Sequence, residues 1–228
     1  MTNQDPSIID ARTSRRERSV ARVIDPARQR AEQRVQQFLD ATREMLLAQP
    51  DSDLTVQEVV ERSGLSLRSF YQHFGGKHEL LLAVFEDSVR QTEVLLRAAV
   101  DTSDDPLERL HLLVVNFYLL SAGVRTGKGS GVPGLSRFAQ SLLSDHPTEA
   151  SAALQPVAAL FEVLLSQAVK SGVAEAGPRP RRRAAFLMQT VNFNAYVMAG
   201  AGTARSRRDE AAAAEDLWEL LLNGLAPR

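Results

Sequence analysis

Polar side chains between Thr55 and Lys77 form the part of the sequence whose residue types could do chemistry as a group. They carry hydroxyl, guanidinium, amide, imidazole and ammonium groups, which hydrogen-bond to phosphate oxygens and to the edges of bases. Arg68 is the expected base reader, because one guanidinium can bond two acceptors of guanine at once. We expect contacts to DNA from Thr55, Ser66, Leu67, Arg68, Ser69, Tyr71, Gln72, His73 and Lys77.

Two short helices are predicted to position these residues. Thr55 and Glu58 have the spacing of a capping box, so a helix is predicted to begin there. Gly64 suits the end of that helix, and Ser66 can cap a second helix over 67–74. The spacing of three apolar and turn positions is typical of a helix-turn-helix: Val60, Gly64 and Phe70.

This stretch resembles the N-terminal domain of TetR-family transcriptional regulators. The resemblance covers about residues 35 to 82 and is most specific in the run Tyr71-x-His73-Phe74-x-x-Lys77-x-x-Leu80. It implies a three-helix DNA-binding domain, supports a phosphate contact from Tyr71, and implies a divergent helical domain behind it. In that second domain, the resemblance implies that the last two helices form a dimer bundle.

Other kinds of chemistry find little support in the sequence. The chain has no cysteine, which excludes disulfides, thiolate zinc sites and cysteine nucleophiles. Gly129 to Gly134 match G-x-G-x-x-G, but no strand is predicted before them and Pro133 removes an amide. The four histidines lack the spacing of a metal site, and Asp101, Asp104 and Asp105 suit a helix start. We expect no metal, no cofactor and no enzymatic activity.

The composition predicts an all-α fold with about nine helices. Of 228 residues, 44% are hydrophobic and 24% are charged, as in soluble globular chains, and strand patterns are nearly absent. Three regions are predicted: a disordered basic arm over 1–25, a helix-turn-helix domain over 26–76, and a ligand-binding and dimerisation domain over 77–228. Pro26 is expected in the first turn of the first helix.

The arm has two interpretations. Five arginines and one acid lie between Arg12 and Arg22, although the net charge of the whole chain is only −1. Such a bias suits a segment near phosphate, and it equally suits a solvated tail without a partner. No apolar run follows these arginines, so no secretory signal is expected. We also expect no membrane span and a cytoplasmic location.

A small-molecule pocket is expected between Pro106 and Gly200. Aromatic and amide side chains occur there on otherwise apolar helices, and buried amides without partners are costly. The expected effector is apolar and neutral or weakly charged. The expected lining residues are Asn116, Phe117, Tyr118, Phe138, Phe161, Gln189, Asn192, Phe193 and Tyr196.

A homodimer is expected through apolar stripes on the last two helices, which implies a roughly palindromic DNA operator. The expected interface residues are Phe186, Val197, Leu217, Trp218, Leu221 and Leu222. The sequence thus predicts a ligand-responsive DNA-binding regulator, most simply a repressor. Two alternatives stay open: a ligand-independent architectural helix-turn-helix protein, and an enzyme in the C-terminal domain.

Overall fold

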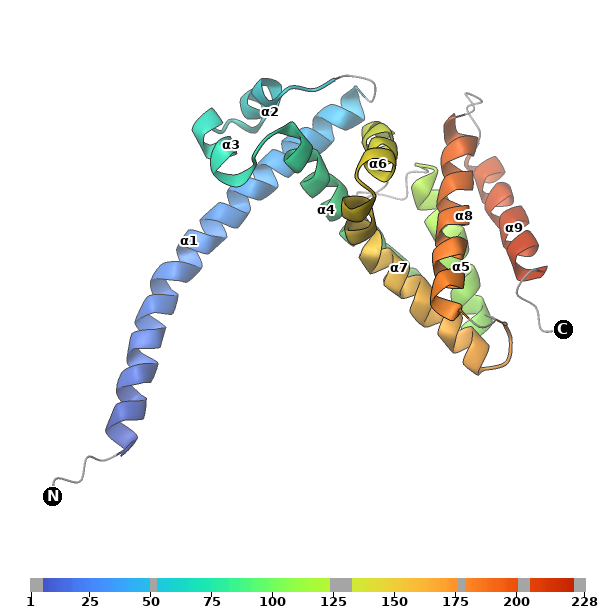
Figure 1. The fold of residues 1–228 in the computed structure, drawn as a ribbon, viewed down its shortest axis with the longest axis horizontal. Helices are drawn as coiled ribbons and strands as arrows, with labels where there is room; N and C mark the ends of the chain where they lie inside the picture. The colour runs from blue at the N-terminus through green and yellow to red at the C-terminus, as the bar shows by residue number, and fades with distance from the viewer. Residues whose placement is uncertain (1–5, 50–52, 124–132, 176–178, 201–205, 224–228) are drawn as a thin grey trace. The chain divides into compact units, whose positions relative to one another are not determined.

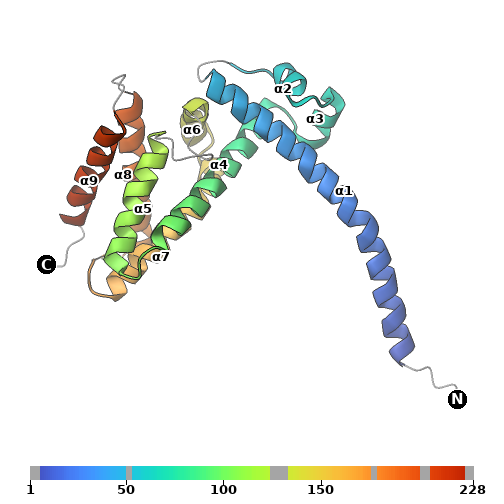
Figure 2. The same cartoon turned by 180° about the vertical axis from the view of Figure 1, so that it is seen from behind.

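The computed structural model describes residues 6–49, 53–123, 133–175, 179–200 and 206–223, and within these ranges the chain is all-α with nine helices (Figures 1 and 2). The predicted fold class is confirmed for this part of the chain. The helices are α1 (Pro6–Ala48), α2 (Val56–Ser63), α3 (Leu67–His73), α4 (Lys77–Val100), α5 (Pro106–Ser121), α6 (Pro133–Asp145), α7 (Pro147–Lys170), α8 (Pro180–Gly200) and α9 (Arg207–Asn223).

The chain divides into two compact units. The first comprises Met1–Thr42 and Leu54–Leu80, and the second comprises Arg43–Asp53 and Leu81–Arg228. The sequence places this boundary after Gly76, whereas the boundary in the structure lies four residues further on, inside α4. Helix α4 is therefore shared by the two units.

Aromatic rings hold the first unit together. Phe38 of α1 contacts Phe70 and Phe74 edge-on, with ring centroids 5.5 Å and 5.9 Å apart. All three rings are buried, as is Val59 of α2. Edge-to-face pairs of this kind contribute about 0.5–1.5 kcal/mol each beyond the apolar area that they bury. This core fixes α2 and α3 against α1.

Helix α1 is much longer than the sequence predicts. It begins at Pro6 instead of near residue 27, and Pro26 lies inside it. The expected disorder of residues 1–25 is therefore wrong for residues 6–25. Five of these twenty residues are arginines, which favour helix. A proline inside a helix removes one backbone hydrogen bond, and α1 continues through it. Residues 1–5 lie outside the described part of the chain.

The second unit is built around α5, which packs against α7, α8 and α9. Its largest fully buried side chains come from four elements: Leu96 of α4, Leu110, Leu113 and Tyr118 of α5, Leu142 of α6, and Phe161, Leu164 and Leu165 of α7. Asp105 caps α5, with its carboxylate accepting the amides of Leu107 and Glu108 at 2.7 Å and 3.0 Å. The acidic turn before α5 is thus a helix start, as the sequence predicts.

One described helix, α7, is long and apolar enough to cross a membrane, judged by length and composition alone. This helix is not apparent as a candidate span in the sequence, because Pro156 and Glu162 interrupt its apolar run. Its buried residues are Ala150, Ala153, Val157, Leu160, Phe161, Leu164, Leu165 and Ala168. Burial in the core of the second unit accounts for its apolar character.

An ion pair inside the second unit joins the end of α1 to α4. A guanidinium nitrogen of Arg43 lies 2.5 Å from a carboxylate oxygen of Asp87, and both side chains are largely buried. The same oxygen of Asp87 accepts the amide of Gln91 at 2.7 Å. Removing one member of such a pair leaves the other charge buried without its compensation, which is costly.

Candidate DNA-binding site

Helix α2 begins at the predicted capping box. The hydroxyl of Thr55 accepts the amide of Glu58 at 3.3 Å, and the amide of Thr55 donates to the carboxylate of Glu58 at 2.7 Å. Two of the amides left free at a helix start are thereby satisfied within the chain. The start of α2 still carries the positive end of the helix dipole, which favours a nearby phosphate.

The turn between α2 and α3 depends on one glycine. Gly64 has φ +68°, and its amide donates to the carbonyl of Glu61 at 3.3 Å. This left-handed conformation costs a residue with a side chain about 1–2 kcal/mol. Ser66 then caps α3, with its hydroxyl accepting the amide of Ser69 at 3.1 Å. The chain therefore reverses within a few residues, and the start of α3 is fixed.

The outward face of α3 carries four of the predicted DNA contacts: Leu67, Arg68, Tyr71 and Gln72, all exposed. The Tyr71 ring packs edge-on against Phe70 at 5.3 Å, so its position is set by the core while its side chain stays 59% exposed. A rigid aromatic base with a free phenol end suits a contact to phosphate.

Two predicted contacts on α3 face the other way. Ser69 is buried and His73 is half-buried, because positions 69, 70 and 73 fall on the side of the helix that meets the core. The Ser69 hydroxyl and Nε2 of His73 are buried and have no hydrogen-bond partner among the described residues. The expectation that both lie on the exposed face is therefore wrong.

The turn after α3 depends on a residue that the sequence analysis missed. Glu79 lies in the first turn of α4, and its carboxylate accepts the amide of Gly75 at 2.6 Å. A side chain at Gly75 would approach the same oxygen to 2.9 Å. This contact fixes the start of α4, where Lys77 is the first residue and is half-buried. In the sequence, the spacing of four residues between Gly75 and Glu79 was the signal that could have predicted this contact.

These two helices and their flanks match a known family. A model of bacterial regulatory proteins of the tetR family matches residues 38–84. The match runs from the end of α1 through α2 and α3 into the start of α4. Residues 38–84 thus form a TetR-family helix-turn-helix domain. The helix-turn-helix predicted from Val60, Gly64 and Phe70 is the part of the fold that carries this match.

Part of the chain is also similar in sequence to a curated relative. The HTH-type transcriptional regulator BetI of Brucella anthropi is 28% identical over 95 residues, which are 41% of this chain and 46% of that relative. The alignment thus spans less than half of the relative's length.

Solved structures of the family extend the likeness in fold to the second unit. A TetR-family transcriptional regulator from Pectobacterium atrosepticum has a TM-score of 0.67 at 21% identity, covering 88% of this chain and 98% of that one. The regulator FadR from Bacillus subtilis, solved in complex with stearoyl-CoA, has a TM-score of 0.66 at 18% identity, covering 83% and 98%. At these identities the likeness concerns the fold.

The residues expected to line a pocket are divided by the structure into three groups. Phe117, Tyr118 and Phe161 are buried in the core of the second unit, where Phe117 and Phe161 contact edge-on at 5.3 Å. Asn116, Phe138, Asn192 and Tyr196 are half-buried. Gln189 and Phe193 are exposed on α8, so their expected place in a pocket is wrong.

Two of the four amides behind the pocket prediction, Asn116 and Asn194, have partners within their own helices. The side-chain amide of Asn116 donates to the carbonyl of Leu112 at 2.8 Å, and that of Asn194 donates to the carbonyl of Thr190 at 2.8 Å. A bond to the carbonyl four residues back satisfies the donor without any ligand. The cost of burying these amides is therefore a weaker argument for a pocket than the sequence analysis assumes.

The residues expected at a dimer interface also differ in how exposed they are in the single chain. Phe186 and Val197 are exposed on α8. Trp218 of α9 is buried, with its ring 5.1 Å from that of His111, and its place in an interface is a wrong expectation. The remaining three are half-buried against the core of the same chain: Leu217, Leu221 and Leu222. Leu220, which the sequence analysis did not single out, is 69% exposed on α9.

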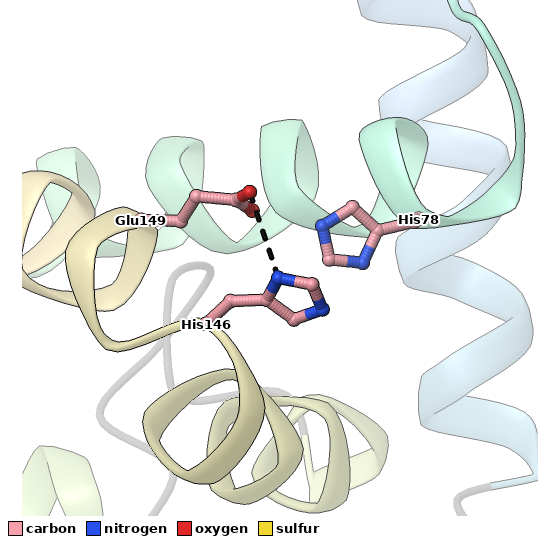
Figure 3. A group of neighbouring side chains, drawn as sticks. All are labelled: His78, His146 and Glu149. Carbon is pink, nitrogen blue, oxygen red and sulfur yellow. Dashed lines mark ion pairs between the residues drawn. The ribbon is translucent and has the colours of Figure 1, made fainter.

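Histidines in the second unit pair with carboxylates. Nε2 of His111 lies 2.7 Å from a carboxylate oxygen of Glu215, which joins α5 to α9. Nδ1 of His146 lies 3.7 Å from a carboxylate oxygen of Glu149 at the start of α7 (Figure 3). Pairs of this kind stabilise helix starts and helix contacts by modest amounts.

Proposed function

We propose that this TetR-family chain is a sequence-specific DNA-binding repressor of transcription. The observation that carries the proposal is the outward face of α3, where Arg68, Tyr71 and Gln72 are exposed on a helix fixed by Gly64 and the aromatic core. In this account Arg68 and Gln72 read base edges in the major groove, and Tyr71 contacts phosphate.

The phosphate contacts come from the ends of two other helices. The N-terminus of α2 at Thr55 offers its dipole to the backbone of the duplex, and Lys77 adds a charge at the start of α4. Ser66 and Leu67, exposed at the start of α3, lie beside the base-reading positions. Phosphate contacts set the orientation of α3, whereas base contacts give the sequence preference.

We further propose a homodimer, and the exposed face of α8 supports it. Phe186, Phe193 and Val197 recur at intervals of seven and four residues, which places them on one side of the helix. Their exposed fractions are 54%, 66% and 42% in the single chain. Leu220 of α9 adds a fourth exposed apolar side chain. A dimer would remove these side chains from water and would read a roughly palindromic operator.

A small-molecule effector is the third part of the proposal. The fold likeness to FadR, solved with stearoyl-CoA, supports a ligand in the helical domain, and the abundance of apolar residues on α5, α7 and α8 supports an apolar one. We take it to be neutral or weakly charged, and we place the protein in the cytoplasm. Release requires that the ligand bind more tightly to the dimer conformation that fits DNA poorly.

Helix α4 is the route by which such a ligand would act, because it belongs to both units. The Arg43–Asp87 pair fastens it to the end of α1 within the second unit. A shift of α4 in the second unit is then carried along the helix to its first residues, next to the end of α3.

We expect particular apolar compounds to stabilise the protein against heat and to weaken its binding to the operator. A compound at a hundred times its dissociation constant adds about 2.7 kcal/mol to the free energy of unfolding, which raises Tm by roughly 5–10 °C. Hydrogen exchange should slow in α5, α7 and α8 when the compound binds. The measurement is a thermal-shift screen followed by exchange and DNA binding.

The same screen distinguishes a ligand-responsive repressor from a ligand-independent architectural protein. An architectural helix-turn-helix protein would be stabilised by DNA and by no compound, and its DNA affinity would not respond to any of them. Membership of a family of transcriptional regulators speaks against the third possibility, an enzyme in the C-terminal domain.

A further inference from the structure

The first part of α1 is a long helix that the helix-turn-helix core does not need. Helix α1 spans 43 residues, and among its side chains from Pro26 on, which the structure describes, the first buried ones are Phe38 and Leu39. In Figures 1 and 2, the N-terminal half of α1 runs clear of α2 and α3, which belong to the same unit. Among the described side chains before Phe38, Arg28, Arg30 and Arg34 are exposed.

The helical backbone places the charged residues of this segment on two opposite sides. Successive residues of an α-helix are turned by about 100°, which fixes the angular position of each residue around the axis. Six of the eight arginines between residues 6 and 34 fall within an arc of about 120°. This basic face consists of Arg12, Arg15, Arg16, Arg22, Arg30 and Arg34.

The acids occupy the other side. All four acids between residues 6 and 34 fall within an arc of about 80°, nearly opposite the basic face. They are Asp10, Glu17, Asp25 and Glu32. Arg28 lies on this acidic side and pairs with Glu32 at 2.7 Å. Arg18 lies outside both arcs. A solvated surface has no need to separate its charges in this way, whereas a polyanion beside one face favours it.

We propose that the basic face of α1 binds the phosphate backbone of duplex DNA that flanks the operator. The proposal rests on the DNA binding proposed above and assigns a further contact surface to it. From Arg12 to Arg34 the axis rises about 33 Å, close to one turn of B-DNA. A helix about 10 Å wide is too broad for a minor groove of about 6 Å, so the phosphates are the groups within reach.

The test compares two variants with the same change in charge. The first variant, Arg12→Gln with Arg30→Gln, removes two charges at the centre of the basic face. The second variant, Arg18→Gln with Arg28→Gln, removes two charges outside it. Each is measured on a short duplex limited to the operator and on a duplex with roughly one helical turn added on each side, over a range of salt concentrations. Loss of operator binding by the unchanged protein would overturn the proposed function itself, separately from this inference.

We expect the first variant to match the unchanged protein on the short duplex and to bind the long duplex about tenfold more weakly. Its plot of log affinity against log salt on the long duplex should be shallower by nearly 2 per protomer, since each neutralised phosphate contributes about 0.9. The second variant should stay within about twofold on both duplexes. Equal losses in both variants would overturn the inference in favour of a flexible cationic arm, and no loss in either would exclude the flanking DNA as the partner.

A third variant tests the face itself. Two alanines inserted after Ile24 keep every charge but turn the preceding arginines by about 200° relative to Arg30 and Arg34. The affinity for the long duplex should fall as in the first variant, with the helix content by circular dichroism unchanged. Unchanged affinity would contradict a helical face. A change in sedimentation of the arginine variants would instead identify pairing between the basic and acidic faces of two copies.

Discussion

Replacement of Phe193 by aspartate is expected to convert the proposed dimer into a monomer that no longer binds the operator tightly. Phe193 is 66% exposed in the single chain, so the substitution leaves the core of the protomer intact. In a dimer, the same position would hold an unpaired charge inside an apolar interface, which is costly. A monomer engages one half-site, so affinity should fall by at least about a hundredfold. Sedimentation and operator binding measure the two effects.

A matched control is available on α4. Val94 is 63% exposed, so Val94→Asp introduces the same charge at an equally exposed apolar position. It should remain a dimer and bind the operator normally. Leu221 is a poorer choice for this experiment, because it is half-buried against the core of its own protomer and its replacement would also affect folding. A Phe193→Asp protein that still sediments as a dimer would place the interface elsewhere.

Arg68→Ala is expected to remove sequence preference more than DNA binding as such. The side chain is exposed near the start of α3, and loss of a guanidinium that bonds two acceptors of guanine costs about 1–3 kcal/mol per half-site. Affinity for the operator should fall accordingly, while affinity for scrambled DNA should change much less. The ratio of the two affinities is the quantity to measure, at one fixed salt concentration.

Lys77→Ala provides the contrast. Because Lys77 is proposed to bind phosphate, it should contribute equally to every sequence, so its replacement should lower both affinities together. The plot of log affinity against log salt should also become shallower, by about 0.9 for each phosphate that is no longer neutralised. If Arg68→Ala keeps the ratio of the unchanged protein, Arg68 is not a base reader and the orientation proposed for α3 is wrong.

The helix-turn-helix could be predicted from the sequence because its signals are local. The capping box at Thr55, the left-handed Gly64 and the cap at Ser66 each act within a few residues, and all three have the predicted geometry. The spacing of Val60 and Phe70 followed from the periodicity of a helix, which needs no knowledge of distant parts of the chain.

The faces of the longer helices could not be predicted in the same way. Trp218 belongs to an apolar stripe that fits a dimer as well as a core, and only the position of α5 decides that it packs beside His111. The amides of Asn116 and Asn194 suggested a pocket, but each bonds to its own helix. Ser69 is polar yet buried, because its position lies on the same side of α3 as Phe70, which faces the core.

The extent of α1 was missed for a different reason. A charged segment with few apolar residues has the composition of a disordered tail, and Pro26 is typical of a helix start. In the structure α1 nevertheless continues through Pro26, and the residues that follow it have high helix propensity. The separation of charges becomes visible only once the segment is known to be helical.

The central claim is that the chain reads a DNA sequence through α3, and selection of bound duplexes from a random library tests it most directly. The account predicts enrichment of one motif with two inverted half-sites, their centres separated by about one helical turn or a multiple of it. In the same selection, Arg68→Ala should lose preference at one position in each half-site while the spacing stays the same. Recovery of duplexes without any shared motif, at a salt concentration where the protein is bound, would contradict the claim.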